Sequence, residues 1–486
     1  MADERRHWQA VIKAFDGYQH YHMSAQHARK MSVLTLPKAE KELYRMLGYM
    51  DKVEAVDEGI RQNQEFLDEM IANPVFSEML KDPEPEDVGH SHAEEYSHDH
   101  SQGHSHSHSQ PQSQTASRPG SPSKPSRSQL DAAQDKVRST LRSFVRDWSP
   151  LGQPERDACY RPCLESLEKH FPSFHDYPEG GEVEIDVDVQ GQVRKEKRRV
   201  RKREEVKVLV PGCGLGRLAM EIASQGFTAQ GNEFSTYMLI ASDWVLNQTT
   251  RPNSHTIYPF LHSFSNHLTT EHHLLLSTTI PDVCPSDVFA GTPHAGGGEK
   301  YKPGAFSMVA GDFEEIYGQP SSSFNREDGG DKEDEKEDQT GQWDAIVTCF
   351  FIDCSRNILN YLRTIHNLLP PLTPSSPSSP GGGGGGGVWI NIGPLLWHFE
   401  NSPTTSAKGE RSVELSLDEV KQLGDLVGFE FQEEKMIKST YTSPPESMLR
   451  HEYTTAFWVA TKKEPRVLIK GDKVVPNPRY TDNKSA

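Results

Sequence analysis

The pattern of apolar and polar positions changes at about Val206. Beyond it, short apolar runs alternate with stretches of helical periodicity, which is typical of βα units that build a mainly parallel sheet. The expected strands lie in VKVLVPG, FTAQGNE, FSMVAGD, DAIVTCFF and VWINIGP, and in the final pair FQEEKMIKSTYT and TTAFWVATKK. We therefore expect an α/β domain over residues 206–466.

Two earlier regions show the three- and four-residue spacing of amphipathic helices. Residues 1–80 form the first, where the apolar positions are Leu43, Met46, Leu47, Met50 and Val53. Residues 130–178 form the second, with Val137, Leu141, Phe144, Val145 and Trp148 on one side. We expect helices in both, and the N-terminal helices could pack against a second copy of the chain to give a homodimer.

Residues 81–129 separate the two helical regions and contain HSHAEEYSHDHSQGHSHSH, with seven histidines and almost nothing apolar. Such a composition cannot bury a core, so we expect a disordered linker. Histidine repeats can bind zinc weakly, but a solvated spacer is the favoured interpretation.

Further polar stretches interrupt or flank the α/β domain. We expect a charged loop at 179–205, flexible insertions at 318–341 and 371–387, and a C-terminal tail at 467–486. The basic run RKEKRRVRKR in the charged loop could act as a nuclear-localisation or nucleic-acid patch, although a surface loop with opposite charges nearby is favoured.

Charge and cysteine content narrow the classes of function. The net charge of -18 argues against a nucleic-acid or membrane-surface binder, because those partners select for excess Lys and Arg. The sequence contains no apolar run of about 18 residues and no signal-peptide core at its start. Six cysteines without paired CxxC motifs fit a reducing compartment. We expect a cytoplasmic protein, with the nucleus as an alternative, that acts on a small molecule or a protein.

A glycine-rich turn follows the first expected strand. Gly212, Gly214 and Gly216 stand in PGCGLGRLA, and Glu233 closes the second strand. Glycines allow positive φ and close backbone approach, and a carboxylate at the second strand end can accept ribose hydroxyls. A dinucleotide site would need a third glycine where Arg217 stands, so the spacing favours S-adenosylmethionine over a dinucleotide. The alternative for the glycines alone is a tight structural turn.

Two more strand ends carry candidate cofactor contacts. Asp312 could bind the adenine amino group while the ring of Phe313 covers the base, or the pair could be an acidic turn residue and a core phenylalanine. Cys349 could touch the adenosyl group, or it could be an apolar core residue. We expect no metal ligand among the site residues.

The chain resembles the carnosine N-methyltransferase family. The similarity covers the N-terminal helices and roughly residues 130–463, and it rests on VRDWS, ERDACY, VLVPGCGLGRLAMEIASQGF, QGNEFS, AGDFEEIY, TCFFIDC, WINIGPLLWHFEN, ELSLDEV, STYT and EYTTAFW. The resemblance implies a Rossmann-like class I methyltransferase sheet, mostly parallel with its last strand antiparallel, and an N-terminal helical region. It also implies S-adenosylmethionine as methyl donor and methylation of an imidazole nitrogen of carnosine to give anserine.

The resemblance also implies residue roles. Arg146, Gly212, Glu233, Asp312, Phe313 and Cys349 would bind the cofactor, and so would Ser143, which stands where the family has a glutamine. Substrate would contact Asp353, His398, Tyr441, Tyr453 and His451, the last of which stands where the family has a tyrosine.

Methyl transfer to imidazole needs a neutral ring held in one tautomer. A carboxylate bonded to the ring N–H would select that tautomer and stabilise the positive charge that develops. Asp353 is the candidate carboxylate and His398 a second catalytic group. From position alone, Asp353 could equally be a helix N-cap, and His398 a structural histidine.

Two alternatives change the function. The same residues could methylate a histidine of a peptide or protein. The chain could also be a non-catalytic binding or scaffold protein that has retained the fold, which the intact set of motifs argues against.

Overall fold

A computed structural model describes most of the chain in two compact units. The described residues are 2–74, 76, 126–172, 181–189, 191–290, 302–318, 338–371, 387–402, 404, 409, 411–444, 446–470 and 473–480. The first unit comprises Met1–Val145, Ser254–Ile280 and Pro444–Leu449, and the second comprises Arg146–Asn253, Pro281–Ser443 and Arg450–Ala486.

The first unit is mainly helical, as the sequence predicted. Its elements are α1 (Ala2–Asp16), α2 (Tyr18–Leu34), α3 (Lys38–Met46), α4 (Tyr49–Ile71), most of α6 (Arg127–Trp148), β5 (His255–Ile257), the π-helix η4 (Thr270–Leu274) and β6 (Thr278–Ile280). Strands β5 and β6 pair antiparallel.

The predicted apolar face of the N-terminal helices is only partly buried. Val53 on α4 is fully buried, whereas Leu43, Met46 and Leu47 are 61%, 73% and 78% exposed. The helical periodicity is broken between them, because α3 ends before Gly48, which takes a left-handed φ of 66°. The apolar residues of α3 therefore lie on a separate short helix that buries none of its side chains.

The second unit contains a seven-stranded sheet in the order β10-β11-β9-β8-β3-β4-β7. Its strands are β3 (Lys207–Pro211), β4 (Thr228–Glu233), β7 (Phe306–Ala310), β8 (Ala345–Cys349), β9 (Val388–Gly393), β10 (Phe429–Ser439) and β11 (Tyr453–Lys462). Neighbouring strands from β7 to β9 are parallel, and β11 is antiparallel to both β9 and β10. The predicted sheet, with its last strand antiparallel, is confirmed.

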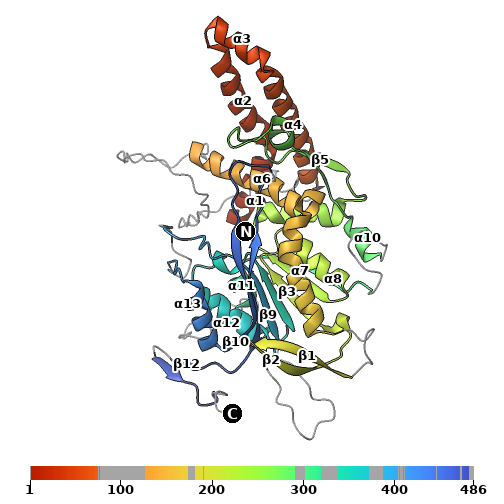
Figure 1. The fold of residues 1–486 in the computed structure, drawn as a ribbon, viewed down its shortest axis with the longest axis vertical. Coiled ribbons are helices and arrows are strands. Elements are labelled where there is room, and N and C mark those ends of the chain that lie inside the picture. Colours follow the sequence, from red (N-terminus) through yellow and green to blue (C-terminus); the bar gives the residue numbers. More distant parts are fainter. Residues whose placement is uncertain are drawn as a thin grey trace, which may run out of the picture. The chain divides into compact units, whose positions relative to one another are not determined.

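Helices cover both faces of this sheet (Figure 1). They are η1 (Pro150–Gly152), α7 (Gln153–His170), η2 (Arg203–Glu205), α8 (Arg217–Ser224), α9 (Thr236–Asp243), the π-helix η3 (Trp244–Gln248), α10 (Pro285–Phe289), α11 (Phe313–Tyr317), η5 (Ile352–Cys354), α12 (Ile358–Leu368) and α13 (Leu417–Val427).

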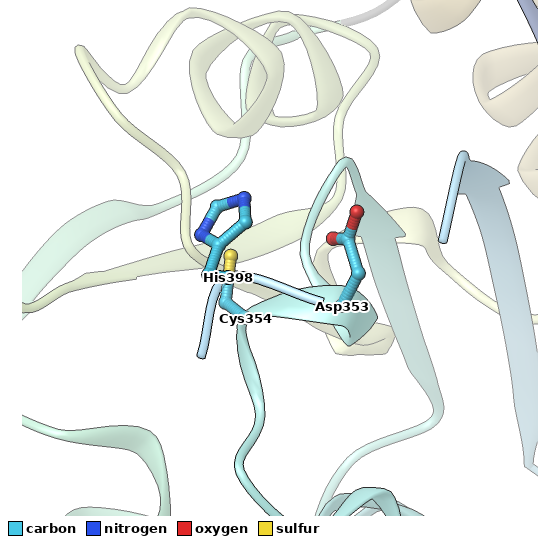
Figure 2. Close-up of side chains that lie close together, drawn as sticks. All are labelled: Asp353, Cys354 and His398. Atoms are coloured by element: carbon cyan, nitrogen blue, oxygen red, sulfur yellow. The ribbon is translucent and has the colours of Figure 1, made fainter. Parts of the chain in front are cut away.

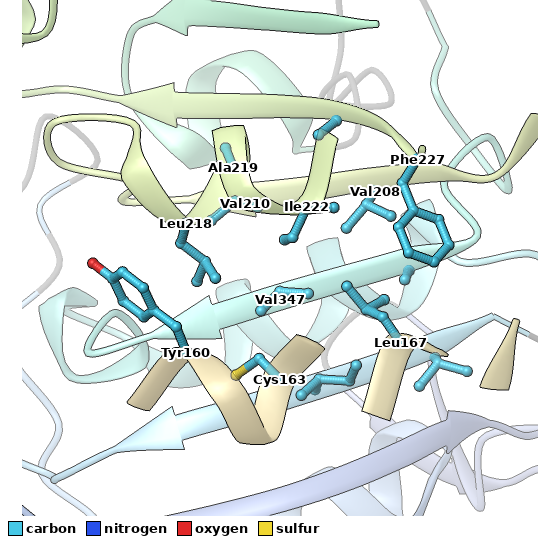
Figure 3. Close-up of a cluster of buried hydrophobic side chains, with 14 of the residues drawn as sticks. Tyr160, Cys163, Leu167, Val208, Val210, Leu218, Ala219, Ile222, Phe227 and Val347 are labelled. Atoms are coloured by element: carbon cyan, nitrogen blue, oxygen red, sulfur yellow. The ribbon is translucent and has the colours of Figure 1, made fainter. Parts of the chain in front are cut away.

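Alternate residues of the central strands enter two separate cores, as the two-residue period of a strand requires. Val208 and Val347 pack with Cys163 and Leu167 of α7 and Ile222 of α8 (Figure 3). Cys159 and Cys163 are thus buried core residues. On the other face, the core joins strand residues to α11, α12 and α13, and it includes Leu209, Ile346, Trp389, Phe429 and Trp458.

Three predicted segments differ from the structure. The charged loop at 179–205 contains an antiparallel hairpin of β1 (Glu182–Val189) and β2 (Gln192–Arg199). The tail at 467–486 contains a second hairpin, of β12 (Val467–Lys470) and β13 (Lys473–Pro476). Residues 254–280, assigned to the α/β domain, belong to the first unit.

The predicted linker and insertions fall largely outside the described residues. The structure describes neither 77–125 nor 319–337 nor 372–386. The end of the linker was placed too late, because α6 already begins at Arg127. Among the described helices, none has the length and apolar character needed to cross a membrane.

Candidate functional site

The predicted site residues of the second unit gather at one edge of the sheet. The parallel pairing of β3, β4, β8 and β9 brings their carboxyl ends to this edge, where ligands of open α/β sheets bind. Gly212 follows β3, Glu233 ends β4, Cys349 ends β8 and His398 follows β9.

The glycine turn has the backbone that the sequence predicted. Gly212, Gly214 and Gly216 have φ values of 63°, 57° and 79°, a region that favours glycine. A Cβ at Gly212 would also lie 2.4 Å from Cδ2 of Phe351. Gly216 then forms the N-cap of α8. The turn therefore needs glycine for conformation and, at Gly212, for space.

Glu233 faces this turn with a buried carboxylate. Its Oε2 accepts the N–H of Gly214 at 2.8 Å, and its Oε1 accepts those of Phe234 and Ser235 at 2.9 and 2.7 Å. Burial raises the pKa of Glu233, and the three N–H groups oppose that shift. A carboxylate has about four acceptor positions, so these bonds leave one on Oε2. A ribose hydroxyl could take that position.

An ion-pair network ties the glycine turn to the segment that carries Arg146. Asp282 accepts from Arg217 through Oδ1 at 2.5 Å and from Arg156 through Oδ2 at 2.7 Å. Arg217 also donates to the carbonyl of Asp147 at 3.0 Å, and Arg156 donates to that of Arg146 at 2.7 Å. Arg217, which replaces the third glycine of a dinucleotide motif, thus acts as a structural link.

Arg146 is a buried cation with weak partners. Its Nη1 donates to Asp147 at 3.3 Å and its Nη2 to the sulfur of Cys349 at 3.7 Å. Its Nε is buried and has no hydrogen-bond partner among the described residues. The guanidinium lies 4.6 Å from the ring centre of Tyr441 and 5.2 Å from that of Tyr160. A buried guanidinium with unused donors fits a carboxylate such as that of S-adenosylmethionine.

Asp312 and Phe313 adopt the structural roles that the sequence left open. Oδ1 of Asp312 accepts the N–H groups of Glu314 and Glu315 at 2.8 and 3.1 Å, so it caps α11. Phe313 is 2% exposed, and its ring packs 5.4 Å from that of Phe351. This burial leaves little of the ring for a ligand, and the predicted adenine contacts of both residues stay predictions.

The ring of Phe350 lies near both the residues predicted to bind the cofactor and the residues predicted to bind the substrate. This residue follows Cys349 with a left-handed φ of 55°, unusual for a bulky side chain. Its ring lies 5.6 Å from the Arg146 guanidinium, 4.9 Å from the Tyr441 ring and 6.0 Å from the Tyr453 ring. Burial raises the pKa of the Cys349 thiol to about 12, so the thiol stays protonated.

Asp353 and His398 come together as predicted (Figure 2). Asp353 is 2% exposed, and its Oδ2 accepts the N–H of Leu396 at 2.9 Å. Its main-chain carbonyl accepts the N–H of His398 at 3.0 Å. Burial raises the pKa of the Asp353 carboxyl, while the Leu396 N–H and His398 partly offset this shift. His398 is exposed beside it. The thiol of Cys354 lies within 4.8 Å of ligand atoms of both residues.

Two predicted residues do not join these contacts. His451 is exposed, and no hydrogen bond or ring contact links its side chain to the described part of the chain. Ser143 is buried on α6 in the first unit, so its predicted cofactor contact stays a prediction.

Sequence reasoning missed three buried residues that support the site. Asp147 accepts the hydroxyl of Tyr160 at 2.7 Å beside Arg146. Asn232 donates to the carbonyl of Gly311 at 2.9 Å and so holds the loop after β7. Asp147 and Tyr160 stand in the quoted motifs VRDWS and ERDACY, and Asn232 directly precedes Glu233. A polar residue within or beside a family motif was the sequence signal that could have identified these three residues.

The strand order, the antiparallel β11 and the glycine turn facing an acidic strand end define a class I S-adenosylmethionine-dependent methyltransferase fold. The chain belongs to the carnosine N-methyltransferase family, whose sequence profile matches residues 123–185 and 176–464. The resemblance noted from the motifs is thereby confirmed.

Curated relatives agree with this assignment. Carnosine N-methyltransferase from Mus musculus is 36% identical over 331 residues, which are 68% of this chain and 64% of the mouse protein. The match to the rat protein has the same extent. Carnosine N-methyltransferase from Schizosaccharomyces pombe is 34% identical over 328 residues, or 67% of this chain and 70% of the yeast protein. The matched region thus spans less than two thirds of the rodent proteins.

Solved structures give more distant likenesses. A SAM-dependent methyltransferase from Methanosarcina mazei is 11% identical, covers 54% of this chain and 93% of its own, and has a TM-score of 0.28. An arsenic(III) S-adenosylmethionine methyltransferase from Chlamydomonas reinhardtii is also 11% identical, covers 55% of this chain and 66% of its own, and has a TM-score of 0.27. The family assignment rests on the sequence matches.

Proposed function

We propose that the protein transfers a methyl group from S-adenosylmethionine to an imidazole nitrogen of carnosine, giving anserine, or of a related histidine-containing di- or tripeptide. Family membership supports the reaction class. The observation that carries the proposal is a buried carboxylate, Asp353, beside the exposed imidazole His398 at the ligand-binding edge of the sheet.

Two side chains at the carboxyl ends of the parallel strands would hold the cofactor. Glu233 would use its remaining acceptor position for a ribose hydroxyl, and the buried donors of Arg146 would bind the cofactor carboxylate. Gly212 keeps the turn free of a side chain there. Bound S-adenosylmethionine supplies an electrophilic methyl group on a positively charged sulfur.

Asp353 would act on the substrate imidazole. Near pH 7 this ring is mostly neutral, with a lone pair on one nitrogen and a proton on the other. If Asp353 accepts that N–H, the lone pair of the other nitrogen points at the methyl group. Formation of the new N–C bond would break the methyl–sulfur bond, with S-adenosylhomocysteine as the leaving group, and the ring would become cationic. Asp353 would stabilise this imidazolium. It would then accept the N–H proton as a general base, so that the product is neutral.

Two side chains would complete the substrate contacts. His398 would pass the proton from Asp353 to solvent, because it is exposed beside the carboxylate. Tyr441, 40% exposed and packed on Phe350, would offer an aromatic wall and a hydroxyl to the ring or to the peptide.

Incubation with methyl-labelled S-adenosylmethionine tests the proposal. Separate reactions would contain carnosine, other histidine dipeptides, or a protein extract. Label in anserine supports the proposed substrate. Label only in polypeptide would instead support a histidine methyltransferase that acts on proteins, and absence of transfer to every acceptor would support a binding protein.

We also propose that two copies associate through the N-terminal helices. Leu43 and Met46 on α3 and Leu47 directly after it expose apolar side chains of the kind that subunit interfaces cover. Sedimentation should show a dimer that the substitution Met46→Glu weakens, and a monomeric wild-type chain would contradict the proposal.

We propose the cytoplasm as the location of the protein, with the nucleus as the alternative. Imaging of a tagged chain tests this location.

A further inference from the structure

Three potential metal ligands of different chemistry meet at the proposed substrate side. A carboxylate oxygen of Asp353, the sulfur of Cys354 and a ring nitrogen of His398 all lie within 4.8 Å of one another (Figure 2). Carboxylate, thiolate and imidazole together are a ligand set that zinc accepts. Zinc bonds of about 2.0–2.3 Å place tetrahedral ligand atoms about 3.3–3.8 Å apart, so small side-chain rotations would close the site.

The backbone already holds these ligands in place. The N–H of Leu396 binds Oδ2 of Asp353 at 2.9 Å, and the N–H of His398 binds the Asp353 carbonyl at 3.0 Å. These bonds connect the loop after β8 to the loop after β9. Hydrogen bonds of this kind orient ligands in metal sites. Within the described part of the chain, neither the Cys354 thiol nor the His398 ring makes a hydrogen bond.

Burial and two carboxylates act on the Cys354 thiol. Burial raises the pKa of the Cys354 thiol well above its ordinary value, and the carboxylates of Asp353 and Glu233 raise it further. The thiol is therefore protonated without a metal. A divalent ion would offset the negative charge and displace the thiol proton to solvent, leaving a thiolate ligand.

We propose that Asp353, Cys354 and His398 bind a thiophilic divalent cation, best matched by Zn²⁺, and that the ion competes with the imidazole substrate. Three protein ligands leave a fourth coordination position for water. An ion on Asp353 would take one of its acceptor positions and cancel the negative charge that stabilises the substrate imidazolium. Zinc would therefore inhibit methyl transfer reversibly. The competition rests on the proposed function, whereas the metal site does not.

Cobalt(II) absorbance tests the metal site without any substrate. Co²⁺ added to the full chain should give the near-ultraviolet band of a cobalt–thiolate bond, and Zn²⁺ should remove it. The histidine-rich segment cannot produce this band, because it contains no cysteine. Cys354→Ser should abolish the band, while Cys284→Ser, a matched control at a buried cysteine on another loop, should keep it.

Zinc affinity and activity complete the test. Cys354→Ser should weaken zinc binding by at least about 100-fold, because losing even an outer-shell partner costs roughly 10- to 100-fold. Without metal, this variant should methylate the substrate as wild type does. With zinc, wild type should lose activity, a chelator should restore it, and Cys354→Ser should resist inhibition.

Each failure has a separate meaning. A wild-type chain without the thiolate band, or a band that survives in Cys354→Ser, overturns the metal site. A chain that shows the band but methylates no imidazole peptide retains the metal site and loses the proposed function. Full activity with zinc bound at the site overturns the competition.

Discussion

The two sides of the candidate site are held very differently. On the cofactor side, the Glu233 carboxylate accepts three backbone N–H groups, and Asp282 links Arg156 to Arg217. On the substrate side, His398 is exposed, and its ring makes no hydrogen bond within the described part of the chain. A preformed pocket suits a cofactor of constant shape, because its ordering cost is met during folding.

Asp353 is the exception on the substrate side. It is buried and held by a backbone N–H, so its position is fixed before substrate binds. The comparison therefore predicts that turnover depends most on this one carboxylate. The affinity for the cofactor should instead fall a little with each contact that is removed from the cofactor side.

The largest effect is expected at Asp353. Asp353→Asn keeps the shape but removes the charge that stabilises an imidazolium, and groups in such roles contribute roughly 10²- to 10⁴-fold. The kcat for methyl transfer should fall by about that factor, measured with labelled cofactor. Cofactor affinity by calorimetry should stay within about three-fold. A variant with most of its activity would contradict the assigned role.

The same residue predicts a pH dependence. Burial raises the pKa of the Asp353 carboxyl, and its charged form is the active one. Activity should therefore be lost as pH falls through this raised pKa, at higher pH than an ordinary aspartate with a pKa of about 3.9 would require. The pH profile of kcat reports groups in the enzyme–substrate complex. The acid limb due to this carboxyl should be absent from the profile of Asp353→Asn.

The second effect concerns Glu233. Glu233→Gln places an amide NH₂ among N–H donors and removes a charge-assisted contact, a loss of about 1.5–3 kcal/mol. The Kd of the cofactor should rise about 10- to 100-fold by calorimetry. At saturating cofactor, kcat should remain close to that of wild type. Unchanged affinity would show that this strand end does not bind the nucleoside.

A smaller effect is expected from Asp282, which acts through its arginine partners. Asp282→Asn should raise the KM for cofactor about 3- to 10-fold and change kcat little, because only the hold on Arg146 and the glycine turn is loosened. Asp344→Asn is the matched control. That aspartate also pairs with an arginine, Arg201, at 2.6 Å, but it precedes β8 at the opposite sheet edge. Equal effects of both variants would indicate general destabilisation.

The smallest effect is expected at His451. His451→Tyr restores the residue type that the family resemblance implies, at an exposed position whose side chain makes no hydrogen bond or ring contact with the residues that the structure describes. The KM for carnosine should change by less than about three-fold, since exposed substitutions usually alter stability by no more than about 0.5 kcal/mol. A larger change of this KM in steady-state kinetics would show that His451 contributes to substrate binding.

The sheet and the positions of its strand-end residues were predictable because both depend on local patterns. Apolar runs such as VKVLV mark strands buried on both faces, and parallel pairing brings their carboxyl ends together. The glycine turn was predictable for the same reason. Asp353 and His398 were assigned to the site by the family resemblance, because strand position alone left an N-cap and a structural histidine as alternatives. Each follows a central strand.

One local hairpin was missed, and two further features depend on partners that are distant in sequence. The hairpin of β1 and β2 was missed because its charge suggested a loop, although EVEIDVDV alternates strictly and Glu184 pairs opposite Lys197. No local pattern shows that Asp282 joins Arg156 to Arg217, since the three lie on separate segments. The proximity of the Cys354 thiol to His398 likewise requires the pairing of β8 with β9.

The position of β11 has a consequence for biosynthesis. This strand lies between β9 and β10, both of which leave the ribosome before it. Until residues 453–462 emerge, the outer edge of β9 lacks its partner and β10 has no strand to join. Unpaired strand edges are templates for aggregation. The nascent chain should therefore depend on chaperone protection during this interval, and stalled translation before residue 453 should yield insoluble product.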